Sequence, residues 1–211
     1  MTPTKIPMAS NPGLTRRRML AVLAGGTAVA ALAPRGALAM NTAEARALID
    51  RAVGEINSVI NSGMSESRMY AEFEKIFARY ADVAIIARSA LGPAARQASP
   101  AQMAAFTASF QTYISRKYGR RFREFIGGRI EVTGAKQVKN FYEVTSIAYL
   151  RGEAPFEVRF HVSDRSGRDL FFNIIIEGVN MLATERTEIG ALLDARRGNL
   201  DRLTADLRSM G

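Results

Sequence analysis

Cysteine is absent from the 211-residue chain, and histidine occurs once. Without cysteine there are no disulfide bonds, no thiolate metal ligands and no N-terminal lipoprotein anchor. The lone histidine, His161, is too little for a zinc cluster, and no G-x-S-x-G motif offers a nucleophilic serine. We expect His161 to be solvated on the polar side of a strand. The chain must hold its fold by core packing, and its residue inventory does not indicate an enzyme.

Glycine-rich phosphate-binding loops are also lacking. One Gly-Gly pair, at 25–26, lies in the N-terminal segment, and the pair at 127–128 follows a predicted helix instead of opening one. Glu185 and Glu188 are typical of a surface ion pair or of solvated groups. Glu177, which interrupts an apolar strand just before a glycine, is interpreted as an outward residue at a bulge. No metal, nucleotide or other cofactor is therefore predicted.

Positive charge is concentrated at one end of the chain. The net charge is +9, from 29 basic and 20 acidic residues. Five basic residues and no acidic residue precede Met40, namely Lys5, Arg16, Arg17, Arg18 and Arg35. Without these five, 24 basic residues remain against 20 acidic ones, so the rest of the chain carries only +4. A mildly positive body is weak evidence for a polyanion, and nucleic acid is not a predicted partner.

The first 39 residues have the layout of a signal peptide. Their apolar run, residues 19–32, is shorter than the roughly 20 residues that cross a membrane. Ala37-Leu38-Ala39 matches an A-x-A cleavage site, and TRRRML at 15–20 resembles the twin-arginine export signal. An ordinary secretory signal and an uncleaved anchor are the alternatives. We predict a signal peptide over residues 1–39, a domain over 40–211 and a periplasmic location.

Hydrophobic periodicity divides the remaining chain into helices, then strands, then a last helical region. Helices are predicted over 42–62, 65–80, 83–92, 100–126 and from about 187, with Asn199 capping a final segment. Residues 99–102, SPAQ, form a capping box at the start of the longest helix. Strands are predicted from Ile130 and over 141–150, 156–163 and 171–182. This order predicts an α+β domain with an antiparallel sheet of about four strands.

The segment FFNIIIEGVNML, residues 171–182, is apolar at nearly every position. A strand covered on one face only would alternate more strictly between apolar and polar residues. Its second face therefore needs an apolar cover. The long helix and the strands are rich in aromatic residues, which suit either a filled core or the walls of an apolar pocket. Periodicity does not separate these two arrangements.

Three stretches resemble the MlaC family, also called the toluene-tolerance auxiliary family. FARYADVAIIARSALG (77–92) is similar to the family's D-x-x-x-I-A-x-x-x-L-G segment, and SPAQMAAFTASFQTYISRKYGRRF (99–122) to its T-P-E-Q…F…F…L…Y helix. FFNIIIEGVNMLATERTEI (171–189) is similar to V-Y-D-V-x-I-E-G-V-S-L-V-x-x-Y-R-x-E/Q-F. Phe172, Asn173, Glu185 and Ile189 depart from the most common residues of that last pattern.

The resemblance implies a curved antiparallel sheet wrapped by helices and enclosing an apolar cavity for phospholipid acyl chains. It also implies a soluble periplasmic phospholipid shuttle in the lipid-asymmetry ABC transport system. The expected partners are phospholipid, an inner-membrane substrate-binding component of the MCE type and an outer-membrane lipoprotein complex. The protein would be a monomer that docks transiently, and it would not be an enzyme.

Period and parity select the side chains expected to face such a cavity. They are Phe106, Phe110, Tyr113 and Ile114 from the long helix, and Ile147, Tyr149, Phe156, Val158, Phe160, Phe172, Ile174 and Ile176 from the strands. The register of 141–150 stays ambiguous because both of its faces carry apolar residues. Arg116, Lys117 and Arg120 are the candidates for contacts with a lipid headgroup or a protein partner.

Two other functions stay open on the sequence. A periplasmic adaptor with a filled core would bridge membrane complexes and carry no lipid. In that case Phe110→Ala would cost several kcal/mol of stability, as the opening of a core cavity does. A small hydrolase would depend on His161, and the residue inventory disfavours it.

Overall fold

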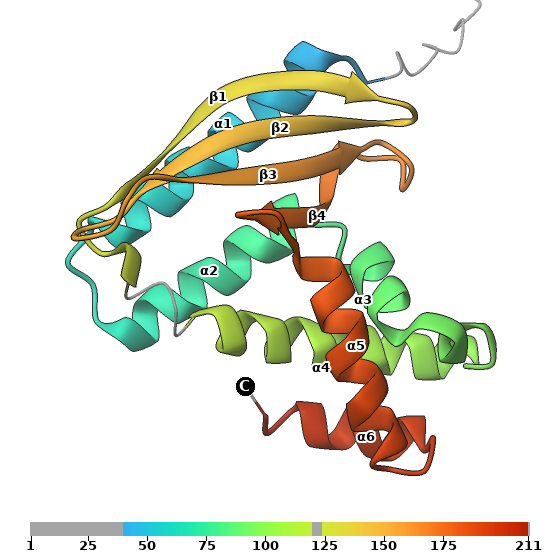
Figure 1. Cartoon of the computed structure of the whole chain (residues 1–211). Helices are drawn as coiled ribbons and strands as arrows, with labels where there is room; N and C mark the ends of the chain where they lie inside the picture. The colour runs from blue at the N-terminus through green and yellow to red at the C-terminus, as the bar shows by residue number, and fades with distance from the viewer. Residues whose placement is uncertain (1–39, 120–123, 211) are drawn as a thin grey trace, which may run out of the picture. The chain divides into compact units, whose positions relative to one another are not determined.

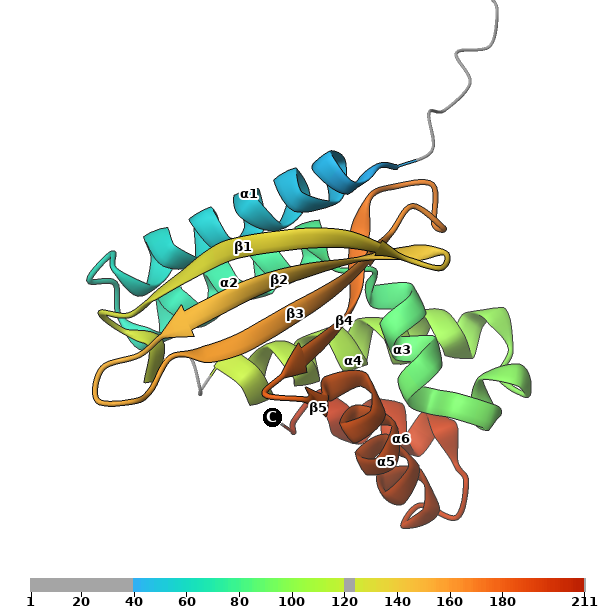
Figure 2. The same cartoon turned by 45° about the horizontal axis from the view of Figure 1, so that its top comes forward.

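The structure is a computed structural model that describes residues 40–119 and 124–210. These residues lie in one compact unit, Leu38–Gly211, shown in two views in Figures 1 and 2. The predicted signal peptide and Arg120 lie outside the described residues. Among the residues that are described, no helix combines the length and the apolar character needed to cross a membrane.

The helices begin and end close to the residues that the capping signals indicate. Asn41 caps α1 in a capping box with Glu44, and Asp82 caps α3 by accepting from the amide of Ile85. The amides of Ser99 and Gln102 bond to each other's side chains at the start of α4. The helices are α1 (Thr42–Ile60), α2 (Glu66–Tyr80), α3 (Val83–Leu91), the 3-10 helix η1 (Gly92–Arg96), α4 (Pro100–Gly119), α5 (Met181–Asp194) and α6 (Leu200–Leu207).

The strands form one antiparallel sheet in the order β1-β2-β3-β4-β5. Their bounds are β1 (Arg129–Val138), β2 (Phe141–Tyr149), β3 (Phe156–Ser163), β4 (Leu170–Ile176) and β5 (Val179–Asn180). Four long strands agree with the prediction, and β5 adds a short fifth. The order of helices, antiparallel meander and helices confirms the predicted α+β class.

Three predicted elements have the wrong extent. Residues 171–182 are not one strand, because Glu177 and Gly178 both adopt positive φ and close a tight turn between β4 and β5. Glu177 is therefore a turn residue and not a bulge residue. The last helical region accordingly starts at Met181, earlier than the predicted 187. The long helix is described as far as Gly119, and residues 124–125 form a 3-10 turn instead of continuing it to Ile126.

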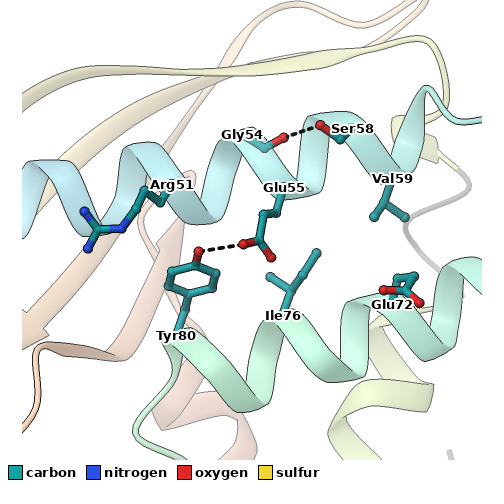
Figure 3. A pocket seen from close by; sticks show the side chains of 8 residues that line it. All are labelled: Arg51, Gly54, Glu55, Ser58, Val59, Glu72, Ile76 and Tyr80. Atoms are coloured by element: carbon teal, nitrogen blue, oxygen red, sulfur yellow. Dashed lines mark hydrogen bonds between the residues drawn. The ribbon is translucent and has the colours of Figure 1, made fainter.

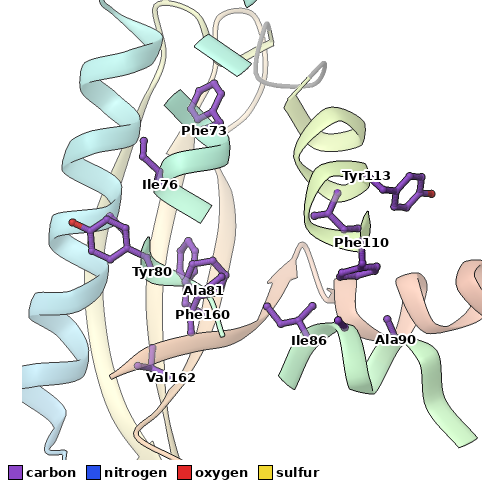
Figure 4. Close-up of a cluster of buried hydrophobic side chains, with 14 of the residues drawn as sticks. Phe73, Ile76, Tyr80, Ala81, Ile86, Ala90, Phe110, Tyr113, Phe160 and Val162 are labelled. Atoms are coloured by element: carbon purple, nitrogen blue, oxygen red, sulfur yellow. The ribbon is translucent and has the colours of Figure 1, made fainter. Parts of the chain in front are cut away.

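The layers of the unit are visible in both views. The helix α1 lies along β1 and β2, and the side chain of Asn57 bonds to both backbone groups of Ile130. The helices α3 to α6 gather beyond β4, and the link between α2 and α3 bonds to β4 through the amide of Asp82 and the carbonyl of Phe171. Figure 4 shows buried side chains from these groups of elements. The sheet thus turns one face towards the helices.

Register assigns each strand residue to a face. Val144, Ser146 and Ala148 of β2 are buried and stand opposite Phe160, Val158 and Phe156 of β3. These residues define the inner face, which looks towards the helices. The register therefore removes the ambiguity of the segment 141–150.

Candidate apolar binding cavity

An apolar cavity of about 380 Å³ lies between the inner face of the sheet and the helices. The volume is within the roughly 300–1,000 Å³ of small-molecule sites. Its apolar walls come from five helices and from β1, β3 and β4, and the side chains include Ala52, Ile56, Phe73, Ile76, Phe77, Ile86, Ile114, Ile130, Phe156, Val158, Phe160, Phe171, Ile174, Ile176, Met181 and Leu182. A guest in this space would meet mainly hydrocarbon.

Seven of the twelve residues selected from the sequence line this cavity. They are Ile114, Phe156, Val158, Phe160, Phe172, Ile174 and Ile176. The alternation of β3 and the second half of β4 placed most of them, because period 2 keeps residues 156, 158 and 160 on one face. Whether they contact a lipid stays a prediction.

The other residues selected from α4 lie elsewhere. Phe106 and Phe110 are 0% exposed, and their rings stack on each other with centroids 5.7 Å apart. In Figure 4 Phe110 points towards Ile86 and Ala90, whereas Tyr113 points away from them. The hydroxyl of Tyr113 donates to Glu188. A step of four residues turns about 40° around a helix, so the stripe 106, 110, 114, 118 winds from the helical core to the cavity wall.

Ile147 and Tyr149 stand on the outer face of the sheet. Ile147 is opposite Glu131 and Glu157, and Tyr149 lies under the guanidinium of Arg129 at 3.9 Å from its ring centroid. Their positions follow from the register of β2, which the sequence left open. Neither residue lines the cavity.

Phe172 occupies a bulge. Phe171 pairs with Val162 and Asn173 pairs with His161, so Phe172 has no partner of its own. Its ring packs against those of Phe141 and His161, although the residue also contributes to the cavity lining. The prediction assumed that every second residue before Ile174 faces the cavity. It missed the direction of Phe172, because a bulge shifts the alternation of side chains by one residue.

The lining from α1, α2 and α3 was not selected from the sequence. Phe73, Ile76 and Phe77 belong to the apolar stripe that predicts α2, so a signal for burial was present. That signal gives the face of the helix that is covered. It does not say whether a neighbouring side chain or an empty space covers it.

Polar groups in the lining fall into two classes. Glu124, Glu153 and Glu177 are exposed, which marks the part of the cavity that is open to solvent. Ser115, Asn173 and Glu185 are buried, at 8%, 6% and 3% exposure. The prediction of a surface position for Glu185 is therefore wrong. Among the described residues, the solvent-exposed polar lining is acidic and not basic.

Lys117 and Arg116 make contacts within the helical layer. The ammonium of Lys117 bonds to Glu185 at 2.8 Å and also to Glu188. A guanidinium nitrogen of Arg116 donates to the carbonyl of Arg208 at 2.6 Å. Arg120, the third predicted contact residue, lies outside the described residues. Neither Arg116 nor Lys117 is part of the cavity lining.

The cluster around Lys117 is electrostatically coupled. Burial lowers the pKa of Lys117, but its bonds to Glu185 and Glu188 more than offset this, and its pKa is raised. Burial and then the bond to Glu185 raise the pKa of Tyr118 far above its usual value. Tyr118 is therefore a neutral donor to Glu185 at any ordinary pH.

A second hollow lies between α1 and α2 and has a different character. Figure 3 shows its lining, in which the hydroxyl of Tyr80 donates to Glu55 at 2.8 Å. Its volume is about 460 Å³, and Arg51, Glu72 and Ser58 also border it. Arg51, Gly54 and Ser58 are exposed, and three of the lining residues are charged, so this groove is an ordinary surface cleft between two helices.

His161 is not solvated as predicted. Its side chain is 13% exposed, its ring lies 4.5 Å from that of Phe141, and its Nε2 is 3.3 Å from Glu143. Burial lowers the pKa of His161, while Glu143 opposes this. Within the described residues, no group of three or more potential metal ligands occurs.

The comparisons with known proteins identify the family of this chain and a solved structure with a similar fold. A family model described as MlaC protein matches residues 49–209, most of the chain. A phospholipid-binding protein from Ralstonia solanacearum, solved in complex with a phospholipid, has a similar fold at a TM-score of 0.65 and 19% identity. That match covers 77% of this chain and 98% of the other. The MlaC family is periplasmic and non-enzymatic, which confirms the prediction that the chain is not an enzyme. By the extent of the family match, the chain belongs to the MlaC family.

Proposed function

We propose that the protein binds phospholipid and holds the acyl chains in the apolar cavity. The observation that carries this proposal is the cavity itself. Apolar side chains line most of it, and exposed residues mark the part that is open to solvent. The phospholipid complex of the Ralstonia solanacearum protein, which shares the fold, supports it. Acyl chains would then form the second cover of the apolar strand β4.

The energetics explain why such a protein is needed. Two acyl chains hold on the order of 30 methylenes, and each buried methylene is worth about 0.8 kcal/mol. Exposing both chains to water would thus cost at most roughly 24 kcal/mol. A protein that replaces the bilayer around the tails removes most of this cost. Because the hydrophobic effect has no direction, apolar walls suffice and no catalytic group is required.

We further propose that the protein carries phospholipid between an outer-membrane lipoprotein complex and an inner-membrane MCE-type transport component. The family supports this role, and the exposed acidic lining supplies polar surface where lipid would enter and leave. Residues 1–39 would direct twin-arginine export and would be removed after Ala39.

The contacts of Met40 support processing at that site. Met40 is 4% exposed, its amide nitrogen donates to Asp164 at 3.2 Å, and its carbonyl accepts from the hydroxyl of Tyr142. Cleavage after Ala39 would convert this nitrogen into an ammonium beside a carboxylate. N-terminal sequencing of the exported protein should therefore begin at Met40. A start several residues later would remove these contacts and contradict the proposed site.

Lipid binding is tested on the full chain produced in bacteria. Protein purified without detergent is extracted with organic solvent, and the extract is analysed by mass spectrometry. We expect about one phospholipid molecule for each protein molecule. Circular dichroism checks that the purified protein is folded. If extracts of folded protein repeatedly contain no phospholipid, the proposal is contradicted and the adaptor with no cargo is favoured.

A further inference from the structure

Charge is distributed unevenly over the described residues. Residues 83–119, which form α3, η1 and α4, contain four basic residues and no acidic residue. Residues 40–82 contain five basic and seven acidic residues, and residues 124–180 contain seven and eight. Residues 181–210, which form α5 and α6, are balanced with five of each. The excess of positive charge in the described part of the chain thus lies in one stretch of the helical layer.

An arginine from α5 lies against the end of α3 within this layer. Gly92 ends α3, and its amide donates to the carbonyl of Arg88 one turn earlier. A Cβ atom at Gly92 would be 3.2 Å from Nε of Arg186 and 3.6 Å from its Cζ, so the guanidinium of Arg186 lies where the glycine has no side chain. Arg88 and Arg186 are both exposed. The helices α3 and α5 therefore bring two exposed arginines to the same end of α3.

Neither arginine is neutralised by a described residue. Arg79 and Arg129 each form an ion pair with a glutamate, whereas Arg88 and Arg186 form no hydrogen bond or ion pair in the described part of the chain. The C-terminal end of a helix carries a partial negative charge, which favours a guanidinium beside Gly92 but does not cancel its full charge. The N–H groups of both side chains thus stay available to a partner.

The acidic residues of α5 next to Arg186 are occupied elsewhere. Glu185 is buried and bonds to Lys117, and Glu188 bonds to the same ammonium. The residues of α5 three and four positions from Arg186 carry no charge, and they are Leu182, Ala183, Ile189 and Gly190. No carboxylate of α5 within one turn of Arg186 therefore offsets its charge.

The chemistry of these two side chains favours carboxylates on a protein partner. The planar guanidinium can bind a carboxylate through two parallel hydrogen bonds. An anionic bilayer is a poorer match, because each basic residue near its surface contributes only about 1 kcal/mol and stable binding needs a second, apolar signal. The large apolar residues that are exposed in the described part are Met64, Ile126 and Val179, and none of them belongs to α3, η1 or α5.

We propose that Arg88 and Arg186 form the centre of a docking surface for an acidic face of a protein partner. Arg96 of η1, which is also exposed and forms no ion pair with a described residue, belongs to the same acid-free stretch. The inference rests on the proposed carrier role and gives one of its two membrane components this acidic face. Attraction between opposite charges speeds association without requiring a large apolar interface, which suits a carrier that must leave after each transfer.

The test measures binding of the lipid-loaded protein to the purified MCE-type component and to the purified outer-membrane lipoprotein complex of the same bacterium. Biolayer interferometry gives both rate constants. We expect Arg88→Glu and Arg186→Glu each to lower the association rate constant for at least one component about fivefold at low ionic strength. The difference should nearly vanish at about 1 M salt, where the Debye length is about 3 Å. Arg186→Lys should keep the association rate and raise the dissociation rate, since lysine keeps the charge but not the fork.

Arg165→Glu is the matched control, because it makes the same change in net charge at an exposed residue of the turn between β3 and β4. Association should stay close to that of the wild type, and every variant should retain its co-purified phospholipid. An equal effect of Arg165→Glu and Arg186→Glu, or no effect of either, would overturn the docking surface and leave the carrier role standing.

Phosphatidylglycerol vesicles provide the second arm of the experiment. If Arg186→Glu reduces binding to these vesicles and leaves binding to both protein components unchanged, the surface faces a membrane and the acidic partner is wrong. Wild-type protein that binds neither component would overturn the proposed carrier role, and the docking surface with it. Phospholipid binding would be unaffected by that result, since it is measured separately by extraction.

Discussion

Two apolar regions of this protein are built from the same kinds of residue and are organised differently. In the helical region, Phe106 and Phe110 are completely buried and stack on each other. Under the sheet, Phe156, Ile174 and their neighbours border an open space of about 380 Å³. The helix α4 contributes to both, since Phe110 belongs to the first region and Ile114 to the second. Hydrophobic residues are thus divided between holding the fold and surrounding a guest.

The largest effect is expected in the packed region. Phe110→Ala should lower the free energy of unfolding by about 3–5 kcal/mol, because close-packed neighbours cannot collapse fully into the space. Denaturant unfolding followed by circular dichroism measures this. Lipid content per folded molecule should change little, since Phe110 does not line the cavity. A loss of stability at Phe110 therefore does not distinguish an adaptor from a lipid-binding protein, contrary to the expectation from the sequence. Loss of lipid with unchanged stability would show that the two regions have been assigned the wrong way round.

The same substitution in the cavity wall should cost less. Phe156 is half-buried and its one aromatic contact in the described residues is edge-on to Phe125, with centroids 6.4 Å apart. Phe156→Ala should therefore lower the free energy of unfolding of lipid-free protein by only about 1–2 kcal/mol. It should also weaken lipid retention, measured as lipid lost during gel filtration. A cost equal to that of Phe110→Ala would mean that the space is closed in solution.

Filling the cavity should lower lipid binding and leave stability nearly unchanged, which is the reverse of the effect expected for Phe110→Ala. Ile174→Trp adds bulk on the inner face of β4, where its neighbours line the cavity. Lipid co-purified per protein should fall severalfold, while the unfolding free energy of the lipid-free protein should change by less than about 1 kcal/mol. An Ala105→Trp variant, at a half-buried position of α4, controls for the effect of adding an indole elsewhere in the protein. Overpacking of a filled core would instead destabilise Ile174→Trp by about 1–3 kcal/mol.

Local signals predicted the elements, and long-range pairing decided the site. Asn199 and the capping box at 99–102 begin helices as predicted, because a cap is set by residues within one turn. The face of Tyr149 depends on its pairing with β1 and the direction of Phe172 on a bulge in β4. Neither appears in a pattern of apolar spacing. Apolar periodicity also places Phe110 and Ile114 together, since it reports burial and not whether the covering layer is packed.

The smallest predicted effect concerns the outer face of the sheet, behind the cavity wall. His161 of β3 contacts Glu143 at 3.3 Å and lies beside Asn173 of the neighbouring strand β4. Arg159 and Lys136 form ion pairs with the same carboxylate of Glu143. Burial is the main cause of its lowered pKa, and Arg159 contributes. The unfolded chain therefore binds a proton at His161 more readily than the folded chain does, so stability falls as pH drops below about 6.5.

His161→Gln should flatten this dependence. Between pH 7.5 and 5.5 the wild type should lose a few degrees of Tm that the variant keeps. Glu143 does not interfere in this window. Burial raises its pKa, but Lys136, His161 and Arg159 more than offset this, and the resulting lowered pKa lies below the unfolded value of about 4.3. Thermal unfolding of lipid-free and lipid-loaded protein at both pH values measures the effect. Because His161 itself is outside the cavity lining, the pH-dependent loss should be the same in both forms. A loss that disappears on lipid loading would mean that the lipid acts on His161 through Phe172 and Asn173, which contact it and line the cavity.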